Sequence, residues 1–298
     1  MSANLNQTNI EIDDPNFQAL FADLQGNILK GHGRDHSRHI FFRFTGTSDE
    51  HCRWVETFAP RVTSTLAQEQ QTRQFKAGGH HQVFVNFMLT CSGYRALDVP
   101  QKYWPQDKAF RAGMKDLQVH YDTLPRGDHS PKSNPLNDDV QQWESAFRHN
   151  IDGMILLAYA GESEQETEQV LAEQVAGLKK ELAGIAEIIL IQVGHVMRNE
   201  KQQVIEHFGF VDGVSNPKFL FSDLNEEFKN GGYSRNDPSA SLNTVLVKDP
   251  GGDINSYGSY VTYRKLQQNI RGFWKKLDLL ANTLSELGQQ KVDAEYAG

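Results

Sequence analysis

The sequence predicts an α+β fold in which helices cover one face of an antiparallel sheet, in the ferredoxin-like arrangement. Short apolar and β-branched runs alternate with segments of helical periodicity, in the order strand, helix, strand, polar excursion, strand, helix, strand. The same strand-then-helix opening returns near residue 258. This repetition indicates the start of a second ferredoxin-like unit.

The first half of the alternation ends near residue 97. Phe17, Leu20 and Leu24 have helical spacing, and the run that begins at His39 is aromatic and β-branched as in a strand. Thr90 stands where it can cap a short helix. We expect a short helix over residues 17–29, a strand over 39–44 and a helix over 54–62. A second strand is expected over 82–89 and a second short helix over 90–97.

The second half follows a polar excursion. Residues 100–135 are rich in Pro, Gly, Asp and Lys without a steady period, which predicts a long loop with short helices. Residues 154–160 are typical of a buried strand. Ser163 and Glu166 form the pattern of a capping box at the start of a helix, and residues 188–196 supply the strand after it.

The C-terminal third begins with a turn motif and continues through a Gly, Asn and Ser-rich stretch. Residues 259–266 are expected to form a strand, and the spacing of Ile270, Phe273 and Leu277 predicts an amphipathic helix. We therefore divide the chain into a flexible leader (residues 1–16) and a first ferredoxin-like domain (17–200). A motif loop with its connection (201–257) and an incomplete second ferredoxin-like domain (258–298) follow.

Composition excludes several classes of partner. The formal net charge of −8 and a pI near 5.8 argue against nucleic acid and anionic membranes, which need a basic face. No apolar run is long enough to span a bilayer, and residues 1–15 lack the order of a secretion signal. With Cys52 and Cys91 too few for a disulfide framework, these features favour the cytoplasm.

No metal site is expected. His32, His36 and His39 are spaced like metal ligands, but no cysteine or convincing fourth ligand lies near them. We interpret this stretch as a solvated loop, and His80 and His81 in the same way.

The most informative motif is residues 207–217, in which Asp212 and Gly213 follow an aromatic and glycine segment. Asp-Gly followed by Ser-Asn-Pro is a strong turn sequence, because glycine accepts positive φ and Asn-Pro favours a turn. Turn chemistry explains every residue of the motif except Phe208 and Phe210. From the residues alone, both a plain turn and a catalytic carboxylate remain open.

Residues 24–33, 208–217 and 258–269 together resemble the dye-decolourising haem peroxidases. The resemblance implies two ferredoxin-like halves, of the dimeric α+β barrel type, with haem b held mainly by the second half. It implies hydrogen peroxide and a small aromatic reductant as substrates. It makes Asp212 the acid–base carboxylate and places Asp212, Gly213, Val214 and Ser215 against the haem. Arg264 either pairs with a haem propionate or is an ordinary surface charge.

The chain departs from the family pattern beyond the strand expected at 259–266. The family's proximal histidine and distal arginine lie downstream of that strand, and no residue here corresponds to them. His207 shares a loop with Asp212, whereas haem needs groups on opposite faces, and His195 is expected to be a structural strand histidine.

Two hypotheses follow. The first is a DyP-type peroxidase truncated at the C-terminus before the proximal histidine, whose remaining part either belongs to a longer chain or is supplied by a complementing C-terminal fragment, with a homo-oligomer as a further expected partner. The second is a non-catalytic remnant or binding module that lacks haem.

Overall fold

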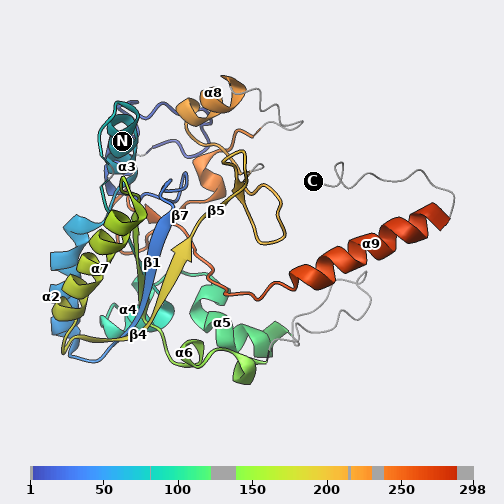
Figure 1. The fold of residues 1–298 in the computed structure, drawn as a ribbon. Helices are drawn as coiled ribbons and strands as arrows, with labels where there is room; N and C mark the ends of the chain where they lie inside the picture. Colours follow the sequence, from blue (N-terminus) through green and yellow to red (C-terminus); the bar gives the residue numbers. More distant parts are fainter. Residues whose placement is uncertain (1–2, 81, 122–138, 214–215, 230–237, 287–298) are drawn as a thin grey trace, which may run out of the picture. The chain divides into compact units, whose positions relative to one another are not determined.

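The computed structural model describes residues 3–80, 82–121, 139–213, 216–229 and 238–286 (Figure 1). By its internal contacts the chain forms two compact units. Unit 1 is Met1–Gly194 with Lys218–Val261, and unit 2 is His195–Pro217 with Thr262–Gly298.

Unit 1 is built on a four-stranded antiparallel sheet in the order β2-β3-β1-β4. Its strands are β1 (His36–Phe44), β2 (Phe84–Leu89), β3 (Gly153–Tyr159) and β4 (Ala186–His195). β3 runs antiparallel to β1 and β2. The main-chain O of Ile185 accepts from Thr45 N at 2.9 Å, and Gly194 lies against Ser37, so β4 runs antiparallel to β1. This order confirms the predicted ferredoxin-like sheet.

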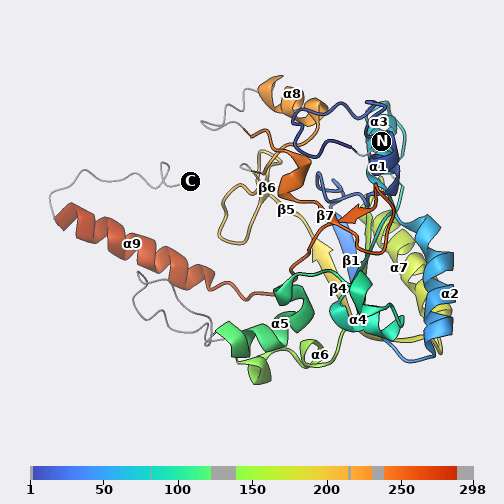
Figure 2. The same ribbon diagram turned by 180° about the vertical axis from the view of Figure 1, so that it is seen from behind.

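Helices cover one face of this sheet, as predicted. α2 (Ser48–Phe58) and α7 (Glu164–Glu181) lie on the same side of β1 and β4 in both opposed views (Figures 1 and 2). Alternate strand residues point into the shared core because side chains in a strand alternate between faces. The buried members from strands and helices include Ile40, Phe42, Ile155, Leu157, Trp54, Phe58, Leu171 and Leu178.

The N-terminus of α7 begins as its sequence predicts, with one difference. Ser163 Oγ accepts from the main-chain N of Glu166 at 3.1 Å. The Glu166 carboxylate accepts from Glu162 N at 2.8 Å and from the Tyr159 hydroxyl at 3.1 Å, instead of from Ser163 N. The serine cap is therefore confirmed, whereas the glutamate ties the helix to the end of β3.

The outer edge of β2 is covered by groups that imitate a neighbouring strand. The Gln25 side chain accepts from Phe87 N at 3.0 Å and donates to Phe87 O at 2.8 Å. Thr63 N donates to Val85 O at 2.9 Å, and Thr63 Oγ1 accepts from Val85 N at 3.1 Å. An edge strand with satisfied main-chain groups is protected from pairing with another chain.

A second core joins the N-terminal segment to residues that follow the motif loop. The expectation of a flexible leader over 1–16 is wrong for its described part, since Ala3, Ile10 and Ile12 are buried. Ile10 N donates to Phe219 O at 3.2 Å, and Ile10 O accepts from Phe221 N at 2.9 Å. The polar residues between these apolar positions concealed the contacts in the sequence.

Several elements differ from prediction. α1 (Gln18–Asp23) is shorter than expected, because the chain after it turns away to bond with residues 63–65. α3 (Thr65–Lys76) was not predicted. In the excursion, by contrast, α5 (Lys108–Tyr121) consists of two short helices that meet at Gly113, where φ is 76°, in agreement with the short helices expected there. The remaining elements of unit 1 are η1 (Ala59–Arg61), α4 (Cys91–Ala96), η2 (Gln101–Tyr103), η3 (Val140–Gln142), α6 (Ser145–Arg148), α8 (Phe221–Lys229) and η4 (Leu242–Thr244).

The strand expected at 259–266 is wrong. β8 covers only Tyr257–Gly258, which pairs with β7 (Val247–Lys248), and residues 259–269 form no strand. β-branched and aromatic residues become a strand only when a neighbour satisfies their main-chain groups, and the described residues provide none there. The amphipathic helix is confirmed as α9 (Ile270–Glu286).

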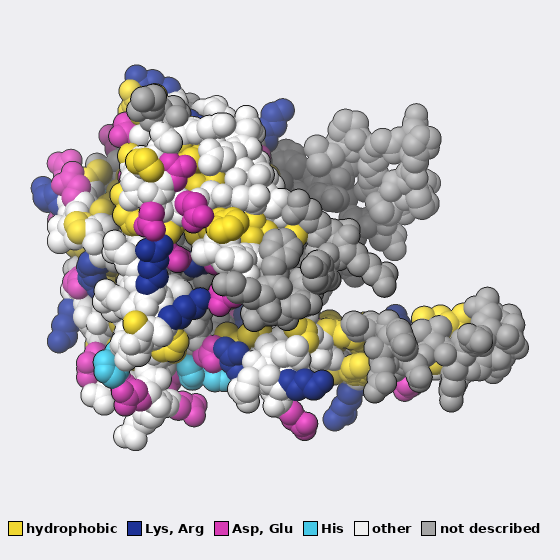
Figure 3. Space-filling model, turned by 90° about the horizontal axis from the view of Figure 1, so that it is seen from above, with side chains coloured by type: hydrophobic (Ala, Val, Ile, Leu, Met, Phe, Trp, Pro, Cys, Tyr) yellow, Lys and Arg dark blue, Asp and Glu magenta, His cyan; other side chains and the backbone are white. Residues whose placement is uncertain are grey.

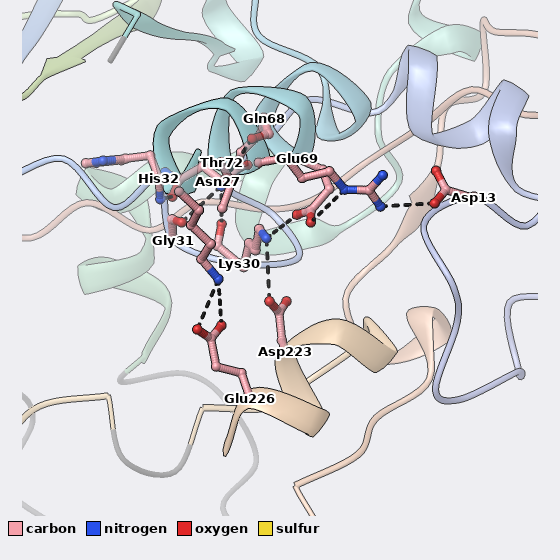
Figure 4. Close-up of polar contacts among 12 residues, drawn as sticks. Asp13, Asn27, Lys30, Gly31, His32, Gln68, Glu69, Thr72, Asp223 and Glu226 are labelled. Atoms are coloured by element: carbon pink, nitrogen blue, oxygen red, sulfur yellow. Dashed lines mark hydrogen bonds and ion pairs between the residues drawn. The ribbon is translucent and has the colours of Figure 1, made fainter. Parts of the chain in front are cut away.

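Charged side chains of alternating sign tie four segments of unit 1 together (Figure 4). Lys30 Nζ contacts the Glu69 carboxylate and lies 3.5 Å from Asp223 Oδ1 on α8. Arg73 lies 3.8 Å from Glu69 Oε1 and 3.0 Å from Asp13 Oδ2. Burial raises the pKa of Asp223, and the Lys30 charge opposes that shift. The central lysine therefore serves two carboxylates that are largely removed from water.

Asp152 is a buried carboxylate that joins β1 to α4. Its Oδ2 accepts from Phe44 N at 2.9 Å, and its Oδ1 accepts from Ser92 Oγ at 2.5 Å. Replacement by alanine leaves a buried N–H without an acceptor, so Asp152→Ala is expected to lower the free energy of unfolding by about 1–3 kcal/mol. Urea denaturation measures the change. Glu56→Ala, which removes an exposed carboxylate on α2, is the control, and an equal effect of both variants would contradict this role.

The expectation of a solvated loop is wrong for His32, His36 and His39. His36 and His39 lie in β1, and the His32 ring lies 5.4 Å from the Phe84 ring. His32 Nδ1 accepts from Arg34 N at 3.1 Å. Burial, followed by the Arg34 charge, lowers the pKa of His32 to about 4.

The lowered pKa of His32 makes the free energy of unfolding depend on pH in a defined direction. Between its ordinary pKa of 6.5 and about 4, the unfolded chain binds a proton that the folded chain does not. Stability is therefore expected to fall as pH falls through this window, by at most ~1.4 kcal/mol per pH unit from this group. Urea denaturation across the window should show a weaker pH dependence for His32→Gln. Equal curves for wild type and His32→Gln, or the same flattening in the control His149→Gln, would contradict the assignment.

Candidate functional site

The motif loop of unit 2 continues directly from a two-stranded ribbon. β5 (Met197–Arg198) pairs with β6 (Val204–Ile205), and the chain then folds back on β6. Val211 forms a bridge with Ile205, and Asp212 N donates to Val204 O at 3.0 Å. The local main chain thus places Asp212 at a defined position beside the ribbon.

Between β6 and Asp212, the Glu206 carboxylate closes the loop. Its Oε2 accepts from Phe208 N at 2.8 Å, and its Oε1 accepts from Phe210 N at 2.9 Å. Gly209 stands between these two amides with a φ of 98°, a conformation that favours glycine. Burial raises the pKa of Glu206, but the two main-chain N–H groups outweigh burial and lower it.

Aromatic contacts anchor the same loop to α9. The Phe208 ring lies 4.5 Å from the Phe273 ring, and the Phe210 ring stacks on Trp274 at 6.0 Å. Gln268 Nε2, just before the helix, lies 3.5 Å from Glu206 Oε2. These contacts explain the two phenylalanines of the motif that turn chemistry leaves unexplained.

Asp212 ends the loop as an exposed carboxylate. Its Oδ1 accepts from Gly213 N at 2.7 Å, and Gly213 has a φ of 78°. The side chain of the preceding Val211 is also exposed. This arrangement presents a carboxylate to solvent, where it can exchange a proton with a bound ligand.

The structure brings together only some of the residues predicted for the site. Asp212 and Gly213 share one turn. Val214 and Ser215 lie outside the described residues. Arg264 is exposed on a separate segment of unit 2, within residues 259–269. The sequence interpretation missed Glu206, because its partners are main-chain N–H groups, which leave no pattern in the sequence.

Other candidate ligands are dispersed. His207 is exposed on the same loop as Asp212, and His195 ends β4. Across the described ranges, no three His, Cys, Asp or Glu side chains are grouped to hold a metal ion. In the same parts of the chain, no helix is long and apolar enough to cross a membrane.

Comparison with known families identifies the family to which the fold of unit 1 belongs. Residues 23–192, more than half of the chain, match the model of the DyP dimeric alpha+beta barrel domain. The chain belongs to the DyP-type peroxidase family. The matched residues include nearly all of the strands of the unit 1 sheet, and the Asp212 motif follows the matched region in the sequence.

Individual DyP-type proteins extend the similarity over nearly the whole chain. The multifunctional dye peroxidase DyP2 of Amycolatopsis sp. is 32% identical over 93% of this chain and 54% of its own length. The crystal structure of a DyP-type peroxidase of Anabaena sp. is 35% identical, with a TM-score of 0.83, over 94% of this chain and 59% of that protein. The structure of DyP2 has a TM-score of 0.78. The chain spans about half the length of the curated relatives it matches.

Proposed function

We propose that this chain supplies the proton-transferring side of a haem peroxidase site, which consumes hydrogen peroxide and oxidises a small aromatic reductant or dye. One observation carries the proposal: an exposed Asp212 is held in a closed turn at the position that the family resemblance gives to the acid–base carboxylate. The relatives that are named dye peroxidases support the reaction class.

Asp212 would act by moving a proton. Its carboxylate can accept a proton from the peroxide oxygen nearest to it and return the proton to the leaving oxygen. Gly213 N–H fixes one carboxylate oxygen and so orients the group. Haem, when bound, supplies the redox chemistry. We place Gly213, Val214 and Ser215 against haem b by the same resemblance, with Arg264 paired to a propionate or left as a surface charge.

The residues of unit 2 fit one face of a haem. Asp212 would supply an exposed carboxylate toward a bound haem, and the exposed His207 lies on the same short loop. We propose that the histidine that would hold haem iron comes from a complementing polypeptide, which would correspond to the part of the relatives outside their match to this chain. The matches cover 54% and 59% of two relatives, so each relative has a further segment that could supply such a ligand.

Unit 2 exposes several large apolar side chains that such a partner could cover. Leu266, Leu279 and Leu280 are 67%, 66% and 54% exposed. Apolar side chains reach the surface among charged ones in the space-filling view (Figure 3). Exposed apolar patches mark interaction sites more often than single exposed residues do.

Peroxide-dependent dye oxidation tests the proposed function. The full chain is co-expressed with the part of Amycolatopsis DyP2 that lies outside its match to this chain, and the purified material is supplied with haem. A Soret band and dye turnover are the expected result. Haem uptake without turnover would contradict the proposal. No haem uptake by either the chain or the mixture would also contradict it and would favour a non-catalytic binding module that lacks haem.

We also propose that the protein works in the cytoplasm. Cys52 and Cys91 are both free thiols, as is common in a reducing compartment. Cell fractionation with an antibody against the chain tests this, and recovery outside the cytoplasmic fraction would contradict it.

A further inference from the structure

Glu206 is an ionisable group at the start of the motif loop that the proposed proton transfer does not use. It stands six residues before Asp212, at the end of β6, and its side chain is half-buried. Both of its carboxylate oxygens are engaged with the main chain of the loop, at Phe208 N and Phe210 N. Apart from one longer contact to Gln268, the carboxylate binds the main chain of its own loop, so its hydrogen bonds fix the loop locally.

The contacts of Glu206 lead to Asp212 without a break. The main-chain N of Glu206 donates to Phe210 O at 3.0 Å. Because the Glu206 carboxylate also accepts from Phe210 N, Glu206 binds both the N–H and the C=O of Phe210. Val211 then bridges to Ile205, and Asp212 N bonds to Val204 O. The register that places Asp212 therefore begins at the Glu206–Phe210 pair.

We infer that Glu206 is a positioning residue, which fixes Asp212 by clamping the main chain of residues 208–210 between its two carboxylate oxygens. The inference rests on the proposed function, because it concerns the geometry of the proposed acid–base carboxylate. Hydrogen bonds from main-chain N–H groups to an ionised carboxylate are stronger than neutral ones, so the ionised form suits this role.

The chemistry of the clamp requires a glutamate. Glutamine has one acceptor oxygen, and its NH₂ group would face one of the two main-chain N–H groups. Aspartate is one methylene shorter and would not span both amides. The neighbours are His207 on the loop itself, Gln268 from the segment before α9, and the aromatic rings of the loop and α9. Gln268 donates to the same carboxylate and adds a third, longer contact.

Amide hydrogen exchange of the full chain without haem tests the clamp. Glu206→Gln is expected to raise the exchange rates of Phe208, Phe210 and Asp212 amides at least tenfold. Amides of β1 and β3 should keep their protection, which verifies that unit 1 remains folded. Glu200→Gln removes the same charge from an exposed position in the β5–β6 turn and should leave all of these rates unchanged.

The outcomes separate the inference from the proposed function. Unchanged exchange at the Asp212 amide in Glu206→Gln, or an equal rise in Glu200→Gln, would overturn the positioning role. With the complementing polypeptide and haem, Glu206→Gln should lower kcat for dye oxidation at least tenfold with KM for the dye unchanged, and an unchanged kcat would also overturn it. If wild type shows no turnover, the proposed function fails, whereas the exchange pattern still decides the clamp.

Discussion

Replacing Asp212 with asparagine is expected to slow peroxide-dependent dye oxidation by roughly 10²- to 10⁴-fold, the range typical of a lost general acid–base. Asparagine has nearly the same shape, and its amide oxygen can still accept from Gly213 N. It cannot take up the peroxide proton. Initial rates of dye bleaching, measured for wild type and Asp212→Asn at equal haem occupancy in the presence of the complementing polypeptide, give the ratio.

Asp278→Asn is the matched control for this comparison. Asp278 is an exposed carboxylate on α9 in the same unit, so its removal changes the net charge equally. Its turnover and haem occupancy should equal those of wild type. A loss of less than threefold for Asp212→Asn would show that another group transfers the proton.

Replacing Lys30 with methionine is expected to be the most destabilising single change in the charged cluster of unit 1. Lys30 serves both Glu69, whose side chain is 8% exposed, and Asp223, whose side chain is 18% exposed. Removing the shared cation leaves two carboxylates with little water and no lysine partner. Breaking a buried ion pair in this way costs about 3–5 kcal/mol. Urea denaturation followed by circular dichroism measures the free energy of unfolding.

Lys76→Met separates burial from charge in this experiment. Lys76 also pairs with α8, through Glu226 at 3.0 Å, but both side chains are more than half exposed. Exposed pairs contribute about 0–1 kcal/mol. The two variants change the same residue type on segments that contact the same helix. Equal losses for both would contradict a special role for Lys30.

The sheet of unit 1 could be predicted because its strands carry strong local signals. β3 is buried along its whole length, and its apolar residues form one uninterrupted run. α3 could not be found from apolar periodicity because its buried side chains are polar: Thr65, Gln68 and Glu69. Gln68 donates to the main-chain O of Gly31, and its Oε1 accepts from Asn27 N. The inner face of α3 binds main chain, so it lacks the apolar stripe by which helices are recognised.

The site was predictable to the extent that turn chemistry is local. Asp212 and Gly213 form the expected turn, because glycine readily adopts the positive φ that Gly213 has in this turn. The role of Glu206 depends on main-chain groups that any residue offers, so no pattern of side chains reveals it. The strand expected at 259–266 failed for a related reason, because a strand depends on a neighbour that its own residues do not specify.

Hydrogen exchange of residues 204–213 with and without haem tests the central claim most directly. The full chain is measured with the complementing polypeptide present in both samples, so that any difference is due to haem. If the Asp212 loop covers one face of the haem, haem should slow exchange in this segment and leave the amides of β1 unchanged. Haem binding that leaves residues 204–213 unprotected would contradict the assignment of this loop to the haem site.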